Sequence, residues 1–170
     1  GPAFVCLHDP EAVRRCEAAG AGGGLELEVG GRGAGSGPPL RAAFTVAGLY
    51  DGKFRETAAR HGGFTAFDQG RTAVVRAESG LTVMVTSRRM VPFSLQQLLS
   101  CGVEPKEMRF LVAKGVHAPA AAYEAVCPSL VRVDTPGLTT ADLSRLEYRR
   151  RRRPLFPFEP GAPWQRGEGG

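Results

Sequence analysis

The sequence predicts an α/β fold in which a mixed β-sheet packs against a few short helices within a single domain. Three observations lead to this prediction. Short apolar runs alternate along the chain with segments of helical spacing, as in chains that pair strands with packing helices. A length of 170 residues is enough for one domain with a core of its own. The 23 glycines and 13 prolines supply the many turns that short elements need.

In the first third of the chain, a helix is expected between strands. Asp9 is a good N-cap, Pro10 suits the first helical position, and Gly20 is a normal helix end. Between the predicted strands at 25–29 and 40–49 lies a glycine-rich loop. It is followed by two prolines and a strand rather than by the helix that a phosphate-binding loop requires. We therefore interpret it as a flexible hairpin connection. The strands are predicted at 3–7, 25–29 and 40–49.

The middle of the chain predicts a hairpin followed by a helix. Residues 50–54 form a turn and residues 55–70 are expected to be irregular. Strands at 72–77 and 81–86 are joined by Glu78-Ser79-Gly80, a spacing typical of a hairpin. A helix over 92–101 then places its leucines on one face and ends at Gly102.

The last third is organised around residues 107–127. An apolar run at 108–113 predicts a buried strand, and helical spacing resumes at Pro119. Lys114 and His117 lie in the turn between these elements. Further elements and boundaries are a strand at 130–133, a helix at 141–146 capped by Thr139 or Thr140, a domain covering 1–158, and a flexible tail at 159–170.

Four basic side chains follow the ends of predicted strands. Arg88 and Arg89 come after the strand at 81–86, and Lys114 and His117 after the strand at 108–113. If these strands share an edge of the sheet, the four side chains form a cationic lip that binds an anion, a substrate carboxylate or another domain. The alternative is a solvated Lys114 and a His117 that merely caps the next helix.

Other chemistries find less support in the sequence. The cysteines lack Cys-x-x-Cys spacing and are expected to be buried free thiols, and the histidines lack the spacing of a metal site. The Asp134-Thr135-Pro136-Gly137 segment is like the aspartate motif of nucleotide-binding proteins, but no Gly-x-x-x-x-Gly-Lys-Ser/Thr loop accompanies it, so we interpret it as a turn at a strand end. The chain has no apolar run of membrane-spanning length and its start lacks a signal-peptide pattern, so we expect a cytoplasmic location and no membrane partner.

A basic run at 149–153 leaves a second function open. These five arginines contribute to a net charge of +5, and such a run is able to bind nucleic acid or an acidic protein surface. No aromatic residue is interleaved with them, which disfavours nucleic acid as a partner. A stand-alone basic binding module remains the alternative to a function at the strand ends.

An ordered set of motifs resembles the C-terminal domain of the MlrC (microcystinase C-like) family over roughly residues 3 to 158. The motifs are His-Asp-Pro-Glu-Ala-Val (8–13), Gly-Gly…Gly-x-Pro-Leu (30–40), Thr-Ser-Arg-Arg-Met-Val-Pro-Phe (86–93), Val-Ala-Lys-Gly-Val-His (112–117), Val-Asp-Thr-Pro-Gly-Leu-Thr (133–139) and Tyr-Arg-Arg-x-Arg-Arg-Pro (148–154). The chain departs from the family at 30–37, where it carries Arg32 among glycine, alanine and serine, whereas relatives often have Asp or His.

The resemblance implies a metallopeptidase-like hydrolase whose zinc ligands and catalytic residues lie in a larger N-terminal domain outside this chain. This chain is then a non-catalytic accessory domain that packs on that catalytic, metal-binding partner. No catalytic residue, zinc ligand or cofactor is assigned to it. Arg88, Arg89, Lys114 and His117 become candidates for contacts with the substrate or with the catalytic domain.

Overall fold

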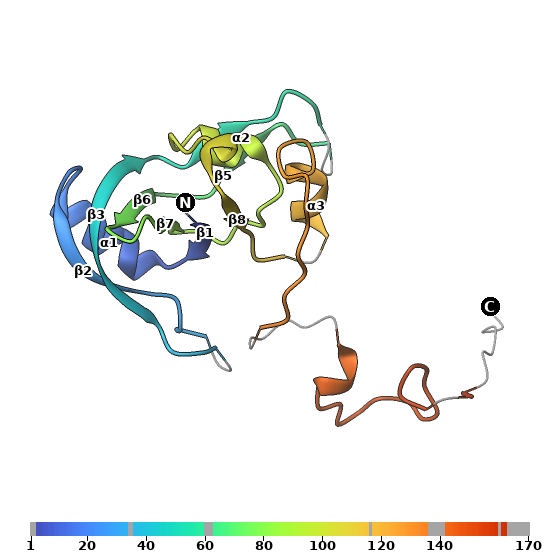
Figure 1. The fold of residues 1–170 in the computed structure, drawn as a ribbon. Helices are drawn as coiled ribbons and strands as arrows, with labels where there is room; N and C mark the ends of the chain where they lie inside the picture. The colour runs from blue at the N-terminus through green and yellow to red at the C-terminus, as the bar shows by residue number, and fades with distance from the viewer. Residues whose placement is uncertain are drawn as a thin grey trace. The chain divides into compact units, whose positions relative to one another are not determined.

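A six-stranded mixed sheet in the order β2-β3-β6-β7-β1-β8 forms the centre of the fold (Figure 1). The computed structural model describes residues 3–33, 36–59, 63–115, 117–135, 142–159 and 161–162, with the backbone alone described for residues 3–5. The chain divides into two compact units, Gly1–Leu138 and Thr139–Gly170. The sheet belongs to the first unit.

Two kinds of strand pairing make the sheet mixed. A meander of four antiparallel strands consists of β2 (Gly24–Val29), β3 (Leu40–Tyr50), β6 (Thr72–Ala77) and β7 (Thr82–Thr86). Strand β1 (Ala3–His8) is parallel to β7, and β8 (Phe110–Val112) is parallel to β1. The predicted α/β class, the 72–77 strand and its hairpin with β7 are thus confirmed.

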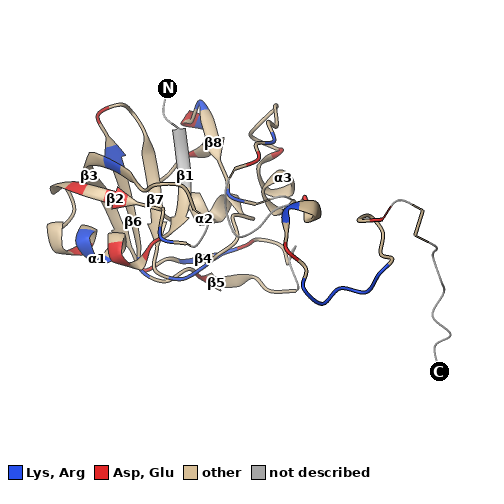
Figure 2. Ribbon diagram, turned by 90° about the horizontal axis from the view of Figure 1, so that it is seen from below, with Lys and Arg blue, Asp and Glu red and all other residues tan. Residues whose placement is uncertain are grey.

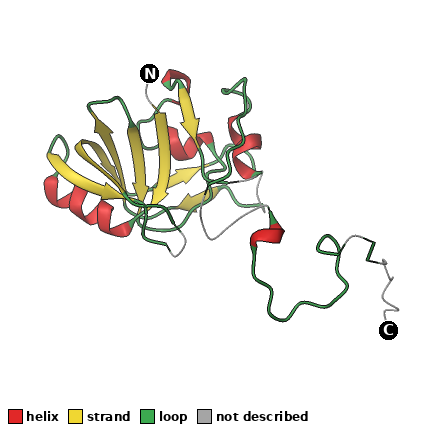
Figure 3. Cartoon of the chain, turned by 60° about the horizontal axis from the view of Figure 1, so that its bottom comes forward, coloured by secondary structure: helices red, strands yellow, loops and turns green. Residues whose placement is uncertain are grey.

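Helices cover both faces of the sheet because its central strands are apolar on both sides. Helix α1 (Pro10–Ala19) packs on one face, against a core that includes Val75 of β6 and Val85 of β7. The alternate residues Val74 and Met84 face a second core, to which α2 (Leu95–Leu99) and α3 (Ala118–Tyr123) contribute. Figure 3 shows α1 along one side of the fanned strands. This two-sided burial is typical of strands at the centre of α/β sheets.

Helix α1 begins and ends where the sequence predicts. The Asp9 side chain accepts a hydrogen bond from the Ala12 N–H at 3.1 Å, and Pro10 occupies the first turn. The Gly20 N–H returns to the Cys16 carbonyl oxygen at 3.0 Å, with Gly20 at a φ of 74°. Helix α2 is shorter than predicted and has Ser94 as its N-cap.

The interval 55–70 is not wholly irregular, contrary to the prediction. Strand β4 (Lys53–Arg55) pairs with β5 (Ala66–Asp68) in a small antiparallel sheet. Phe67 stacks on Phe54 with ring centroids 5.2 Å apart and meets the edge of Phe93 at 4.8 Å. An aromatic cluster of this kind stabilises two strands that are too short to be stable alone.

Two predictions for the last third are wrong. The predicted buried strand at 108–113 is the three-residue edge strand β8, whose Phe110 and Val112 are 58% and 49% exposed because α1 covers the other end of the sheet. The predicted strand at 130–133 is irregular, with Val131 79% exposed and therefore without the burial that would hold an apolar run in a sheet. The turn η1 (Pro105–Glu107) leads into β8.

Among its described residues, the second unit contains the short helical turn η2 (Leu143–Arg145), where the sequence predicts a helix over 141–146. Asp142 caps it by accepting the Ser144 N–H at 3.1 Å; the predicted caps, Thr139 and Thr140, lie outside the described residues. Further along, Arg151 forms two hydrogen bonds with the Glu159 carboxylate. The predicted end of the domain at residue 158 stays a prediction, as does the flexible tail.

Candidate functional site

The three parallel strands β7, β1 and β8 end at the same edge of the sheet, which we call the strand-end edge. His8 of β1 is level with Thr86 of β7, and Val5 of β1 is level with Val112 of β8. Backbone hydrogen bonds join the segments that leave this edge: the Asp9 N–H donates to the Thr86 carbonyl oxygen at 3.0 Å. The Thr86 hydroxyl donates to the Arg88 carbonyl oxygen at 2.9 Å. In open α/β sheets this carboxyl edge is where ligands usually bind.

Arg88 and Arg89 follow β7 at this edge, and both are exposed. Arg88 forms an ion pair with Asp68 of β5, with Nη1 and Oδ2 2.5 Å apart. Its N–H donates to the Gln69 carbonyl oxygen at 3.0 Å, and the buried Gln69 side chain accepts a hydrogen bond from Gln97 of α2 at 2.8 Å. The backbone beneath Arg88 is therefore supported by a buried polar pair.

Lys114 and His117 follow β8 and are also exposed. His117 occupies the N-cap position of α3 but makes no side-chain capping hydrogen bond. The two arginines and the Lys114–His117 pair thus follow strands that end at one edge of the sheet, but these two strands, β7 and β8, are not neighbours. Strand β1 lies between them, and its exposed terminal residue, His8, stands level with the end of β7.

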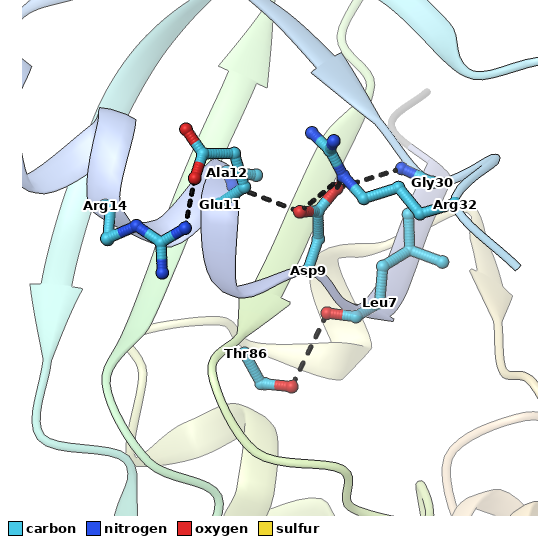
Figure 4. Close-up of polar contacts among 8 residues, drawn as sticks. All are labelled: Leu7, Asp9, Glu11, Ala12, Arg14, Gly30, Arg32 and Thr86. Carbon is cyan, nitrogen blue, oxygen red and sulfur yellow. Dashed lines mark hydrogen bonds and ion pairs between the residues drawn. The ribbon is translucent and has the colours of Figure 1, made fainter.

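A further charged pair at this edge was missed by the sequence reasoning. Asp9 follows β1 and its side chain is 0% exposed. Both of its carboxylate oxygens accept the Arg32 Nε–H at 2.9 Å, and Oδ2 also accepts the Gly30 N–H at 3.3 Å (Figure 4). The hydrogen bond to Asp9 raises the pKa of Arg32, so the guanidinium stays charged. The signal in the sequence was one charged residue in an otherwise small-residue loop.

The curl of the β2–β3 hairpin brings Arg32 to Asp9. Strands β2 and β3 curve along α1 (Figure 1), and Arg15 of α1 donates to the Glu26 carbonyl oxygen of β2 at 2.5 Å. The loop then turns through Gly30 and Gly31, at φ values of 73° and 69°, which non-glycine residues rarely adopt. A Cβ at Gly31 would lie 2.5 Å from the Pro39 nitrogen, so only glycine fits there.

The cysteines are not suited to nucleophilic chemistry. All four are free, as predicted; Cys16 and Cys101 are buried, whereas Cys6 and Cys127 are partly buried. Burial raises the pKa of the Cys6 thiol to about 12 and that of Cys16 to about 11. Thiols with such pKa values remain protonated near neutral pH and are weak nucleophiles.

Two pockets of the first unit are lined by residues other than the four predicted side chains. One, of about 240 Å³, has Glu56, Ser94 and Gln96 among its lining residues, and the Ser94 hydroxyl donates to the Glu56 carboxylate. The other, of about 670 Å³, lies over β4 and β5 and includes Asp68, the partner of Arg88.

Within the described residues, no three His, Cys, Asp or Glu side chains gather as metal ligands would. The described helices also include none that is long and apolar enough to cross a membrane. Figure 2 shows basic and acidic residues mixed over the first unit, and an uninterrupted basic segment in the second.

The curled mixed sheet, with short helices packed on both of its faces, defines an α/β domain. The chain belongs to the family described as "MlrC C-terminus", whose model matches residues 1–150. This match confirms the resemblance found in the sequence.

Two relatives agree with the family assignment. Microcystinase C from Sphingomonas sp. is 27% identical over 155 residues, which is 91% of this chain and 29% of that protein. A crystal structure of a candidate metallopeptidase from Mesorhizobium sp. BNC1 superposes with a TM-score of 0.81 at 26% identity, over 96% of this chain and 32% of that one. The chain thus spans about a third of the length of either relative.

Proposed function

We propose that this chain is the non-catalytic C-terminal accessory domain of an MlrC-like, zinc-dependent hydrolase of the peptidase or amidohydrolase type. The observation that carries the proposal is the match of residues 1–150 to the MlrC C-terminus family, in relatives that are about three times longer. The zinc ion and the catalytic residues would belong to an N-terminal domain outside this chain. The four free cysteines support the expected cytoplasmic location, because thiols persist in reducing compartments.

The strand-end edge is the part of the surface that we assign to the catalytic domain and its substrate. Arg88 and Arg89 are exposed guanidinium groups, which bind carboxylates through paired hydrogen bonds. Asp68 holds one nitrogen of Arg88 and so restricts the orientation of the others. Lys114 adds positive charge, and the exposed His117 would orient a substrate group or donate a proton to it.

Replacing Arg88 and His117 with alanine in a full-length enzyme of this type tests the proposal. We expect kcat/KM to fall about tenfold or more, since a hydrogen bond to a charged group contributes roughly 1.5–3 kcal/mol. Arg76→Ala with Lys106→Ala is the matched control, because both side chains are exposed and lie towards the opposite edge. Unchanged turnover together with unchanged domain association would refute the proposal.

A stand-alone basic binding module is the second candidate. Arg149, Arg150, Arg152 and Arg153 are exposed, which favours it. Arg151 is instead occupied by Glu159 and lies 4.7 Å from the centroid of the Phe158 ring. The module predicts salt-dependent binding of nucleic acid or acidic protein that is lost on deleting residues 149–153. A gel shift that detects no complex at low salt would eliminate it.

A further inference from the structure

The glycine-rich loop carries one side chain with unused hydrogen-bonding capacity. A guanidinium group has five N–H donors. Arg32 gives only its Nε–H to Asp9, and in the described part of the chain neither Nη atom donates a hydrogen bond. Figure 4 shows both Nη atoms pointing away from Asp9. The Arg32 side chain is 49% exposed, so a ligand from solution has access to this fork.

The orientation of this fork is fixed before any ligand arrives. The Asp9 carboxylate is fully buried and is itself held by the Ala12 N–H of helix α1. The Asp9 carboxylate accepts hydrogen bonds from the Arg32 Nε–H and from the Gly30 N–H of the same loop. The Arg32 side chain is therefore held both at its guanidinium group and close to its backbone. Binding to a pre-oriented side chain avoids much of the ordering entropy that a free arginine would lose.

A tie between loop and helix would not by itself require arginine. One donor would close the loop, and the Gly30 N–H already provides one. The loop from Gly30 to Pro39 otherwise contains only glycine, alanine, serine and proline, so Arg32 is its one charged side chain. It stands next to the carboxyl end of β1, at the edge where ligands of α/β sheets bind.

We infer that Arg32 is a carboxylate-binding residue and that Asp9 is its positioning residue. The planar Nη pair matches the two oxygens of a carboxylate. The negative charge of Asp9 offsets part of the positive charge of the guanidinium. A singly charged carboxylate therefore suits the pair better than a doubly charged phosphate. The inference rests on this geometry and does not require the accessory function proposed above, because none of the four side chains in that proposal takes part.

The test uses N-acetyl-triglycine, which ends in a carboxylate, and its C-terminal amide as a matched ligand without the charge. Binding to the 15N-labelled chain is followed by NMR at the Arg32 Nε–H and at the Gly31 and Gly33 amides. We expect the acid to shift these signals and the amide to leave them unchanged. Inorganic phosphate at equal ionic strength should bind more weakly than the acid. No binding of the acid, equal binding of the amide, or tighter binding of phosphate would overturn the inference.

Three variants separate binding from positioning. Arg32→Lys keeps the positive charge but lacks the forked pair of Nη donors, and we expect it to lower the affinity for N-acetyl-triglycine at least tenfold. Asp9→Asn keeps the helix cap, because asparagine caps as well as aspartate, but releases the guanidinium; we expect severalfold weaker binding at an unchanged circular dichroism spectrum. Arg76→Lys, near the opposite edge, should bind as the unchanged chain does. Unchanged affinity in Arg32→Lys or in Asp9→Asn would overturn the corresponding role.

The carboxylate has two possible sources, and a full-length enzyme distinguishes them. A higher KM at unchanged kcat in Arg32→Lys identifies a substrate carboxylate. Faster proteolytic separation of the domains at unchanged KM identifies an Asp or Glu of the catalytic domain. An Arg32→Lys enzyme with neither change would overturn the inference for the assembled protein, whatever the outcome for Arg88 and His117.

Discussion

The buried Asp9 carboxylate holds the Arg32 Nε–H with both of its oxygens at 2.9 Å. The two residues are 23 positions apart, so the pair joins the start of helix α1 to the loop that follows β2. One carboxylate thereby caps a helix, closes a hairpin loop and orients a guanidinium group at the edge of the sheet.

Removing the Asp9 carboxylate should destabilise the fold. Asp9→Ala removes the N-cap of α1 and leaves the Gly30 N–H without its acceptor, and we expect a loss of about 2 kcal/mol in the free energy of unfolding. Asp9→Asn, which retains the cap, should lose less than half of this. Urea titration measures both variants. An alanine variant as stable as the unchanged chain would show that the capping and loop contacts are not stabilising.

The glycine-rich loop should tolerate an added methyl group at one glycine but not at another. Gly31→Ala requires a left-handed backbone and places Cβ 2.5 Å from the Pro39 nitrogen, so it should cost about 1–2 kcal/mol. Gly37→Ala is the matched control, because its Cβ meets no atom within 4 Å; it should be neutral or slightly stabilising. Equal melting temperatures for the two variants would contradict the conformation of the loop.

The raised thiol pKa values predict slow chemistry and a defined pH dependence. With the pKa of Cys6 near 12 and that of Cys16 near 11, both thiols should react with a disulfide reagent at pH 8 far more slowly in the folded chain than in urea. The unfolded thiols ionise near their usual value of 9.0 and the folded ones do not, so stability should fall as the pH rises above 9. Rapid reaction of all four thiols under native conditions would contradict this burial.

The second unit offers an acid-side test. Hydrogen bonds from Arg151, followed by that of the Leu155 N–H, lower the pKa of Glu159 from 4.5 to about 2. A group with a lowered pKa keeps its stabilising contact above the unfolded value and loses it as the pH falls to the folded value. The ion pair between Glu159 and Arg151 should therefore break between about pH 4.5 and 2, as followed by the 13C signal of the carboxylate. Arg151→Ala should return the pKa of Glu159 towards 4.5. A Glu159 pKa near 4.5 in the unchanged chain would exclude the ion pair.

The parts of the fold that depend on local sequence could be predicted. The 72–77 and 82–86 strands alternate between two cores and are joined by the four residues 78–81, so periodicity and turn residues define the hairpin. Asp9, Pro10 and Gly20 mark the limits of α1 through interactions that span at most four residues. The prediction of a strand at 130–133 was wrong because an apolar run forms a strand only where a neighbouring element of the fold buries it.

The strand order and the Arg32 contact depend on distant parts of the chain. The insertion of β1 between β7 and β8 separates Arg88 from His117, and no local pattern indicates it. The contact of Arg32 with Asp9 requires the β2–β3 hairpin to curl along α1, which follows from packing across the whole face. Strands β4 and β5 were missed because each has only three residues and is held by phenylalanines from separate segments.

Amide hydrogen exchange tests most directly whether the strand-end edge meets the rest of a larger enzyme. Exchange at 87–89 and 113–115 is compared between this chain alone and the same domain within a full-length enzyme of the family. We expect at least tenfold slower exchange at these loops in the full-length protein and no change at 78–80, which lies at the opposite edge. Equal exchange at 87–89 and 113–115 in the two proteins would contradict this expectation.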